Sequence, residues 1–141
     1  MKFQIQYSDH ADDAIRQAIL APLLSYNESM TGQSGGRPIV LSITDTEAAV
    51  IGGLWGRTAY GWLYTELLVV PEHMRGQGIG RDLVERAEKE AVARGCHSAW
   101  LDTFQFQARA FYEGLGYVVF GTLDNYPEGF QRYFMVKSLA A

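Results

Sequence analysis

The stretch 66–95 constrains the fold of this chain more than any other part of the sequence. An apolar run at 67–70 ends at a proline, and a glycine then stands at every second position: Gly76, Gly78 and Gly80. An amphipathic pattern typical of a helix begins directly after them. Because the first turn of a helix has unpaired N–H donors and a partial positive charge, this order of strand, glycine loop and helix predicts a phosphate site.

Periodicity predicts the helix that follows the glycines. Its apolar positions recur every four residues, at Ile79, Leu83, Ala87 and Ala91, and indicate one face packed on a core. The opposite face carries three acid-first pairs spaced i,i+4, which are Asp82–Arg86, Glu85–Lys89 and Glu90–Arg94. Gly95 is well placed to end the helix in a left-handed conformation.

Two common phosphate loops do not fit the glycine spacing. A Walker A loop has Lys and then Ser or Thr after its last glycine, whereas Gly80 is followed by Arg81 and Asp82. The dinucleotide fingerprint is G-x-G-x-x-G, and this chain reads G-x-G-x-G. The pattern that fits is R-x-x-G-x-G, beginning at Arg75. It resembles the pyrophosphate loop of the GNAT superfamily, the acetyl-coenzyme A-dependent N-acetyltransferases.

A second segment, 105–117, adds to this resemblance. It reads QFQARAFYEGLGY and is similar to the family's other signature, in which an Asn precedes an amphipathic helix ending in Tyr-x-x-x-Gly-Phe/Tyr. Tyr112 occupies the place of the family's frequent catalytic tyrosine. Gln105 stands where the family most often has Asn, and it offers the same amide chemistry on a longer stem. The two signatures occur in the family's order and at its usual separation, so the resemblance extends over nearly the whole chain.

The resemblance implies acetyl-CoA as co-substrate, bound along the end of a strand and the glycine loop. The residues expected to contact it are Leu68, Val69, Val70, Arg75, Gly76, Gln77, Gly78, Ile79, Gly80, Arg81 and Gln105. A metal site is not expected, because the three histidines lack metal-ligand spacing. Cys96 is a lone thiol with apolar neighbours, expected to be buried and inert, so an acyl-enzyme is not expected either.

Aminolysis of a thioester requires a neutral amine, so a base must take the proton of an ammonium whose pKa is roughly 10.4. Glu66 heads the strand that lines the family's acetyl site and is the expected base; the alternative is a strand-end carboxylate in water. Strand alternation places Glu66, Leu68 and Val70 on one face. Tyr112 is expected to donate a proton to the coenzyme sulfur, and a packed core aromatic is the alternative, although both can hold together.

Composition is that of one soluble globular domain over 1–141. The chain has 48% hydrophobic and 20% charged residues and a single cysteine, which excludes an internal disulfide and suits a reducing cytoplasm. The N-terminus has no apolar h-region, and no apolar run in the sequence approaches the length of a membrane span. A net charge of −4 argues against a nucleic-acid partner.

The pattern along the chain predicts an α/β (α+β) fold with a mixed, mostly antiparallel sheet and helices on both faces. The expected strands are 3–7, 39–43, 48–55, 60–70, 98–103, 117–122 and 132–136. A helix capped by Asp9 is expected over 11–20, and a second one from Pro22 to about Met30. A turn around Asp45 joins the second and third strands.

The expected activity is acetyl transfer to a primary amine of a small molecule in a direct ternary complex. Acetylation of protein N-termini or lysines is the alternative within the enzyme class, and a catalytically silent acyl-CoA-binding domain is the alternative outside it. A homodimer is left open. Aromatic residues near the acetyl site and at the C-terminal hairpin either belong to the core or line an amine pocket, where their ring faces can hold a cation. These are Trp55, Tyr60, Trp62, Tyr64, Tyr126, Phe130, Tyr133 and Phe134.

Overall fold

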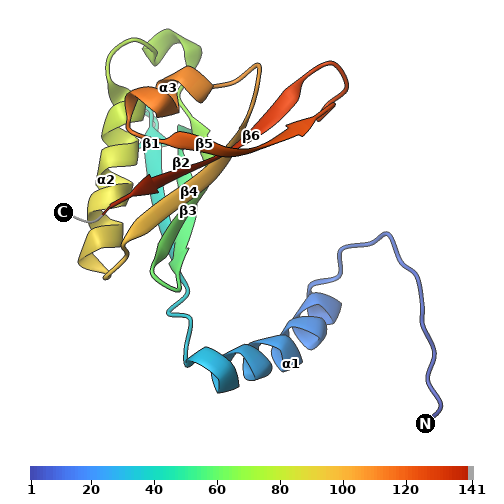
Figure 1. Cartoon of the computed structure of the whole chain (residues 1–141). Helices are drawn as coiled ribbons and strands as arrows, with labels where there is room; N and C mark the ends of the chain where they lie inside the picture. Colours follow the sequence, from blue (N-terminus) through green and yellow to red (C-terminus); the bar gives the residue numbers. More distant parts are fainter. Residues whose placement is uncertain (140–141) are drawn as a thin grey trace. The chain divides into compact units, whose positions relative to one another are not determined.

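A computed structural model of the chain describes residues 1–139 (Figure 1). Its internal contacts divide it into an N-terminal unit, Met1–Ser34, and a larger unit that begins at Gly35. A single domain over 1–141 therefore stays a prediction. The larger unit contains the glycine loop, both signature helices and the whole sheet.

The N-terminal unit is built on one helix, α1, Asp13–Thr31. Its N-cap is Asp12, whose Oδ1 accepts a hydrogen bond from the Ala14 N–H at 2.8 Å, so the prediction of Asp9 as the cap is wrong. The helix continues through Pro22 instead of restarting there, although an interior proline removes one backbone hydrogen bond and crowds the carbonyl of the preceding turn. The strand predicted at 3–7 is also absent: this segment pairs with no other strand in the described chain, and a strand exists only where a partner takes its backbone hydrogen bonds.

The larger unit contains a six-stranded sheet in the order β1-β2-β3-β4-β6-β5. Its strands are β1 Arg37–Thr44, β2 Val50–Ala59, β3 Trp62–Val69, β4 Ser98–Phe104, β5 Val118–Asp124 and β6 Gln131–Ser138. All neighbouring pairs are antiparallel except β3 and β4, which are joined by a helical crossover and are parallel. The mixed, mostly antiparallel sheet is the predicted one.

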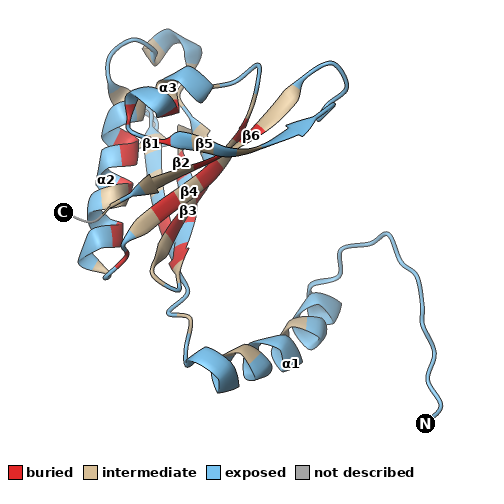
Figure 2. Ribbon diagram, in the orientation of Figure 1, coloured by how far each residue is buried: buried red, intermediate tan, exposed pale blue. Residues whose placement is uncertain are grey.

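Two helices of the larger unit, α2 Ile79–Ala93 and α3 Arg109–Gly114, pack on the same face of this sheet (Figure 1). The predicted apolar stripe of α2 supplies Leu83, Ala87 and Ala91 to the core, which also takes alternate residues from the strands. Figure 2 shows this buried layer between α2 and the sheet. Residues 35–139 place no helix on the opposite face, so helices on both faces are confirmed for one face only.

The end of α2 agrees with the sequence, and its surface does so in part. Gly95 has φ +89°, and the Cys96 N–H donates to the Ala91 carbonyl at 2.9 Å, which is the left-handed end that was predicted. The pairs Asp82–Arg86 and Glu90–Arg94 form at 3.1 Å and 3.0 Å. The third carboxylate, Glu85, contacts Arg81 at 3.4 Å instead of the predicted Lys89.

The parallel strands β3 and β4 separate partway along their length. They are paired from Trp62 opposite Ser98 to Thr65 opposite Leu101, and no further. Both strands continue, β3 to Val69 and β4 to Phe104, without pairing to each other. At the same point β3 carries a bulge against β2, because Gly56 is opposite Thr65 whereas Trp55 is opposite Leu67, which leaves one extra residue, Glu66.

Candidate active site

The glycine loop places free backbone donors at the start of α2. Gly76 and Gly78 both have φ +79°, a left-handed conformation that glycine adopts without strain. Gly78 is the N-cap of α2, and no side chain bonds to the N–H groups of its first turn. The first intrahelical bond of this turn is donated by Asp82 to the Gly78 carbonyl at 3.0 Å. The N–H groups of residues 79–81 therefore remain available to an anion.

Arg75 and Gly80 have structural contacts that the sequence did not predict. The Arg75 Nε donates to the Val70 carbonyl at 3.0 Å and ties the loop to the end of β3. A Cβ added to Gly80 would lie 3.1 Å from the Phe111 ring, so this glycine permits close packing of α2 on α3. Of the three glycines, Gly76 and Gly78 have open space around them.

Glu66 lies on the opposite face of the sheet from α2. Its side chain is exposed and lines a hollow with Trp55 and Arg57 of β2. Leu68 and Val70 pack against the buried core on the other side. The prediction that these three residues share one face is therefore wrong, because the bulge inserts one residue and shifts the alternation that follows it.

Tyr112 lies on α3, with only 6% of its surface exposed. Its ring packs edge-on against Phe111 and Tyr117, so the structure gives it the core position that was the alternative reading. Burial, and next the negative charge of Asp102, raise the pKa of the Tyr112 hydroxyl to about 12. The hydroxyl is therefore protonated at neutral pH, as a proton donor must be.

Asp102 and Arg132 form an ion pair that no sequence motif indicates. Asp102 is the first residue of β4 beyond its pairing with β3, and Arg132 lies on the neighbouring strand β6. The Arg132 Nε and Nη2 both donate to Oδ2 of Asp102, the first at 2.9 Å. Burial, then the charges of Asp102 and Glu66, raise the pKa of Tyr64. Asp102 thus acts electrostatically on a tyrosine of β3 and on Tyr112.

Gln105 uses its side chain to join two strands. Its Oε1 accepts a hydrogen bond from the Gln131 N–H at 2.9 Å, and its own N–H donates to the Gln131 carbonyl at 2.8 Å. The neighbouring amide, Gln107, accepts from the Phe104 N–H at 2.8 Å and shapes the turn before α3. A coenzyme contact of Gln105 stays a prediction.

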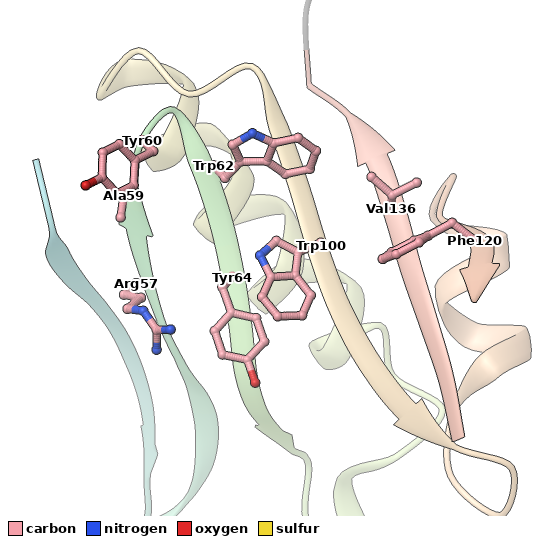
Figure 3. A pocket seen from close by; sticks show the side chains of 8 residues that line it. All are labelled: Arg57, Ala59, Tyr60, Trp62, Tyr64, Trp100, Phe120 and Val136. Carbon is pink, nitrogen blue, oxygen red and sulfur yellow. The ribbon is translucent and has the colours of Figure 1, made fainter. Parts of the chain in front are cut away.

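An aromatic hollow of about 560 Å³ lies on the sheet face opposite α2 (Figure 3). It is lined by Arg57, Ala59, Tyr60, Trp62, Tyr64, Trp100, Phe120 and Val136. The Tyr64 ring stacks on Trp100 with a distance of 4.2 Å between the ring centroids. The Arg57 guanidinium also contacts the Tyr64 ring and lies 4.9 Å from its centroid. Figure 3 shows the Tyr64 hydroxyl pointing along β3, away from Trp62.

Comparisons with known proteins agree with this arrangement. The model of the acetyltransferase (GNAT) family matches residues 5–117. Acetyltransferase Atu2258 of Agrobacterium fabrum is 44% identical over 86% of this chain and 89% of its own length. Blasticidin-S acetyltransferase of Streptomyces morookaense is 38% identical over 62% of this chain and 65% of its own length. A crystal structure from Agrobacterium tumefaciens, assigned as an acetyltransferase, superposes with a TM-score of 0.91 and 40% identity, covering 96% of this chain and 99% of the other.

The chain therefore belongs to the GNAT family of acetyltransferases, and it is an enzyme that uses acetyl-CoA as its acetyl donor. Within residues 1–139, no group of three or more His, Cys, Asp or Glu side chains is placed to hold a metal ion. None of the described helices is both long enough and apolar enough to span a membrane. Cys96 is buried, and burial raises the pKa of its thiol, which disfavours the nucleophilic thiolate.

Proposed function

We propose that this enzyme transfers acetyl from acetyl-CoA to a primary amine of a small molecule by direct attack. The proposal rests on the separation of β3 from β4 beyond the pair Thr65–Leu101. Glu66 lies there on one side of the sheet, and Tyr112 lies on the α3 side. The glycine loop follows β3, and Arg75 bonds this loop to the end of that strand. The free N–H groups at the start of α2 come directly after the loop.

The glycine loop is proposed to hold the coenzyme. N–H groups of residues 76–81 would bind its pyrophosphate, since they combine free donors with the positive end of a helix of fifteen residues. Residues 68–70, at the end of β3, and Gln105 would contact the remainder. Acetyl-CoA supplies an activated carbonyl, and the remaining chemistry is proton transfer and positioning by the chain.

Two residues are proposed to move the protons. Glu66 takes a proton from the ammonium, directly or through water, so that the nitrogen lone pair can form the new C–N bond at the carbonyl. The nitrogen of the resulting tetrahedral adduct gives up its second proton to solvent, and Glu66 likewise releases the proton it took. The C–S bond breaks and leaves its electron pair on sulfur. Tyr112 donates its hydroxyl proton toward this sulfur as negative charge develops there, and solvent reprotonates the phenol. Its raised pKa keeps the hydroxyl in the donor form throughout the neutral range.

A small-molecule acceptor is favoured by the relative that acts on blasticidin S, an antibiotic rather than a protein. The single buried cysteine supports a place in the reducing cytoplasm. The test is release of free thiol from acetyl-CoA with amines, polyamines, aminoglycosides, blasticidin S and short peptides. Turnover with small amines and none with peptides is the expected result. Turnover with peptides alone would contradict the proposed acceptor, and none with any acceptor would contradict direct amine acetylation.

A further inference from the structure

We propose that Asp102 binds the amino group of the acceptor through its Oδ1 oxygen and thereby selects cationic amines. This inference rests on the function proposed above and assigns a second carboxylate to the same site. The two carboxylates have different tasks. Glu66 removes a proton, whereas Asp102 holds the nitrogen in place before and after that step.

The acceptor has to approach from the sheet face opposite α2. The glycine loop and Tyr112 belong to the side of the sheet that α2 and α3 cover. A thioester carbonyl is planar, and a nucleophile attacks it from above or below that plane. With the coenzyme held from the helical side, the nucleophile reaches the carbonyl from the face of the larger unit that carries Glu66 and Tyr64.

Asp102 lies at the edge of this approach. It is the first residue of β4 after the last β3–β4 pair, Thr65 opposite Leu101. Its neighbours Leu101 and Thr103 are buried on the helical side, so strand alternation directs Asp102 to the opposite face. Burial, and next the negative charge of Asp102, raise the pKa of both Tyr64 and Tyr112, so the carboxylate is within electrostatic reach of both hydroxyls.

One oxygen of Asp102 is free to bind a ligand. Both bonds from Arg132 go to Oδ2, and no hydrogen bond within residues 1–139 reaches Oδ1. No buried side-chain oxygen or nitrogen in the described chain lacks a partner, so Oδ1 reaches the surface although the side chain is only 10% exposed. A carboxylate oxygen only accepts hydrogen bonds, and an ammonium or amine group donates them.

Arg132 holds this carboxylate in a fixed orientation. Its guanidinium lies 4.7 Å from the Tyr126 ring centroid and 5.2 Å and 5.3 Å from those of Phe104 and Phe134. These contacts confine the arginine, and its two bonds confine Oδ2. The acceptor thus meets a preorganised oxygen, which costs little conformational entropy on binding.

The test compares Asp102→Asn with the double variant Asp102→Asn/Arg132→Gln, which removes both charges and leaves a neutral amide pair. The probes are the best amine of the panel above and its isosteric alcohol, used as a competitive inhibitor. We expect KM for the amine to rise ~10- to 100-fold in both variants, the range for loss of a charged hydrogen bond. KM for acetyl-CoA and the inhibition constant of the alcohol should stay within about twofold of the wild-type values. The control is Glu113→Gln, which removes a surface carboxylate on α3 and should leave KM for the amine unchanged.

Three outcomes overturn the inference. If the folded double variant keeps the wild-type KM for the amine, Asp102 is only the partner of Arg132. If inhibition by the alcohol weakens as much as amine binding, the residue shapes the pocket without selecting charge. If wild-type enzyme acetylates no amine at all, the proposed function fails and this inference fails with it, a result that the other two do not produce.

Discussion

Gly80 in the first turn of α2 lies directly against the ring of Phe111 on α3, where an added Cβ would stand 3.1 Å from the ring Cζ. The two residues come from the two signatures recognised in the sequence. Their contact fixes the helix that offers N–H groups to the coenzyme against the helix that carries Tyr112. Packing, rather than access for phosphate, is thus sufficient to explain a glycine at position 80.

Gly80→Ala tests this packing. The added methyl group should lower the free energy of unfolding by about 1 kcal/mol, because crowding of about 1 to 3 kcal/mol exceeds the gain in helix propensity of up to about 1 kcal/mol. In a Phe111→Leu background the crowding is relieved, and the same substitution should become neutral or stabilising. Urea denaturation of the four proteins measures this cycle. An equal effect in both backgrounds would show that the ring is not the cause.

Gly78 allows a matched test of the coenzyme site. Asn and Asp are similar in size, both tolerate a left-handed backbone better than most residues, and both can cap a helix. The structure leaves open space around this residue, so neither side chain should clash. Gly78→Asp should weaken acetyl-CoA binding by at least ~10-fold more than Gly78→Asn, since only Asp adds negative charge where the pyrophosphate should lie. Calorimetric titration with acetyl-CoA gives the dissociation constants of both variants. Equal constants would show that the pyrophosphate does not bind at this loop.

Glu66→Gln tests the base. The variant should lower turnover at neutral pH and lose the acid limb of the pH–rate profile, while its affinity for acetyl-CoA stays unchanged. Activity should recover as pH approaches the pKa of the amine, because a neutral amine no longer needs a base. Initial rates from pH 6 to 10 with saturating acetyl-CoA provide the measurement. Wild-type turnover of the variant at neutral pH would show that Glu66 is not the base and that water takes the proton of the amine.

Tyr112→Phe removes the proposed proton donor and keeps the ring. Turnover should fall by roughly 10²-fold, the lower end for general acid catalysis, with little change in KM for acetyl-CoA. Melting temperature should stay near that of the wild type, since Phe keeps the ring that packs edge-on against Phe111 and Tyr117. Steady-state kinetics and thermal melts separate the two roles. Normal turnover combined with earlier melting would return Tyr112 to the core alone.

The same residue predicts a loss of stability in alkali. Burial and Asp102 raise the folded-state pKa of Tyr112 to about 12 from its ordinary value of 10.0. A raised pKa stabilises the fold fully below pH 10, and this contribution is lost as pH rises from about 10 to about 12. Burial and Glu88 also raise the pKa of Tyr117, so part of the decline should persist in Tyr112→Phe. Urea titrations from pH 8 to 11.5 should show a shallower decline for the variant; parallel curves would contradict the shift.

Local signals in the sequence were sufficient to predict the glycine loop, α2 and its left-handed end, because each depends on neighbouring residues. The strand at 3–7 failed since a strand depends on a partner that its own sequence does not specify. The Asp102–Arg132 pair could not be predicted for a related reason: it forms only through the register of β4 against β6. The only signal in the sequence was an acidic residue in one apolar strand and a basic residue in another. That signal did not indicate that the two side chains would form an ion pair.

The bulge at Glu66 separates the packing of the buried layer from the choice of side chain on the exposed face, two requirements that usually constrain each other in a strand. The residues before it, Leu63 and Thr65, belong to the buried layer, and Leu68 rejoins that layer after it. The extra residue contributes nothing to this layer, and its side chain is exposed. Position 66 can therefore change in size or charge while the packing beneath it stays the same. A chain built in this way can acquire a different group on its acceptor face without having to evolve a new core.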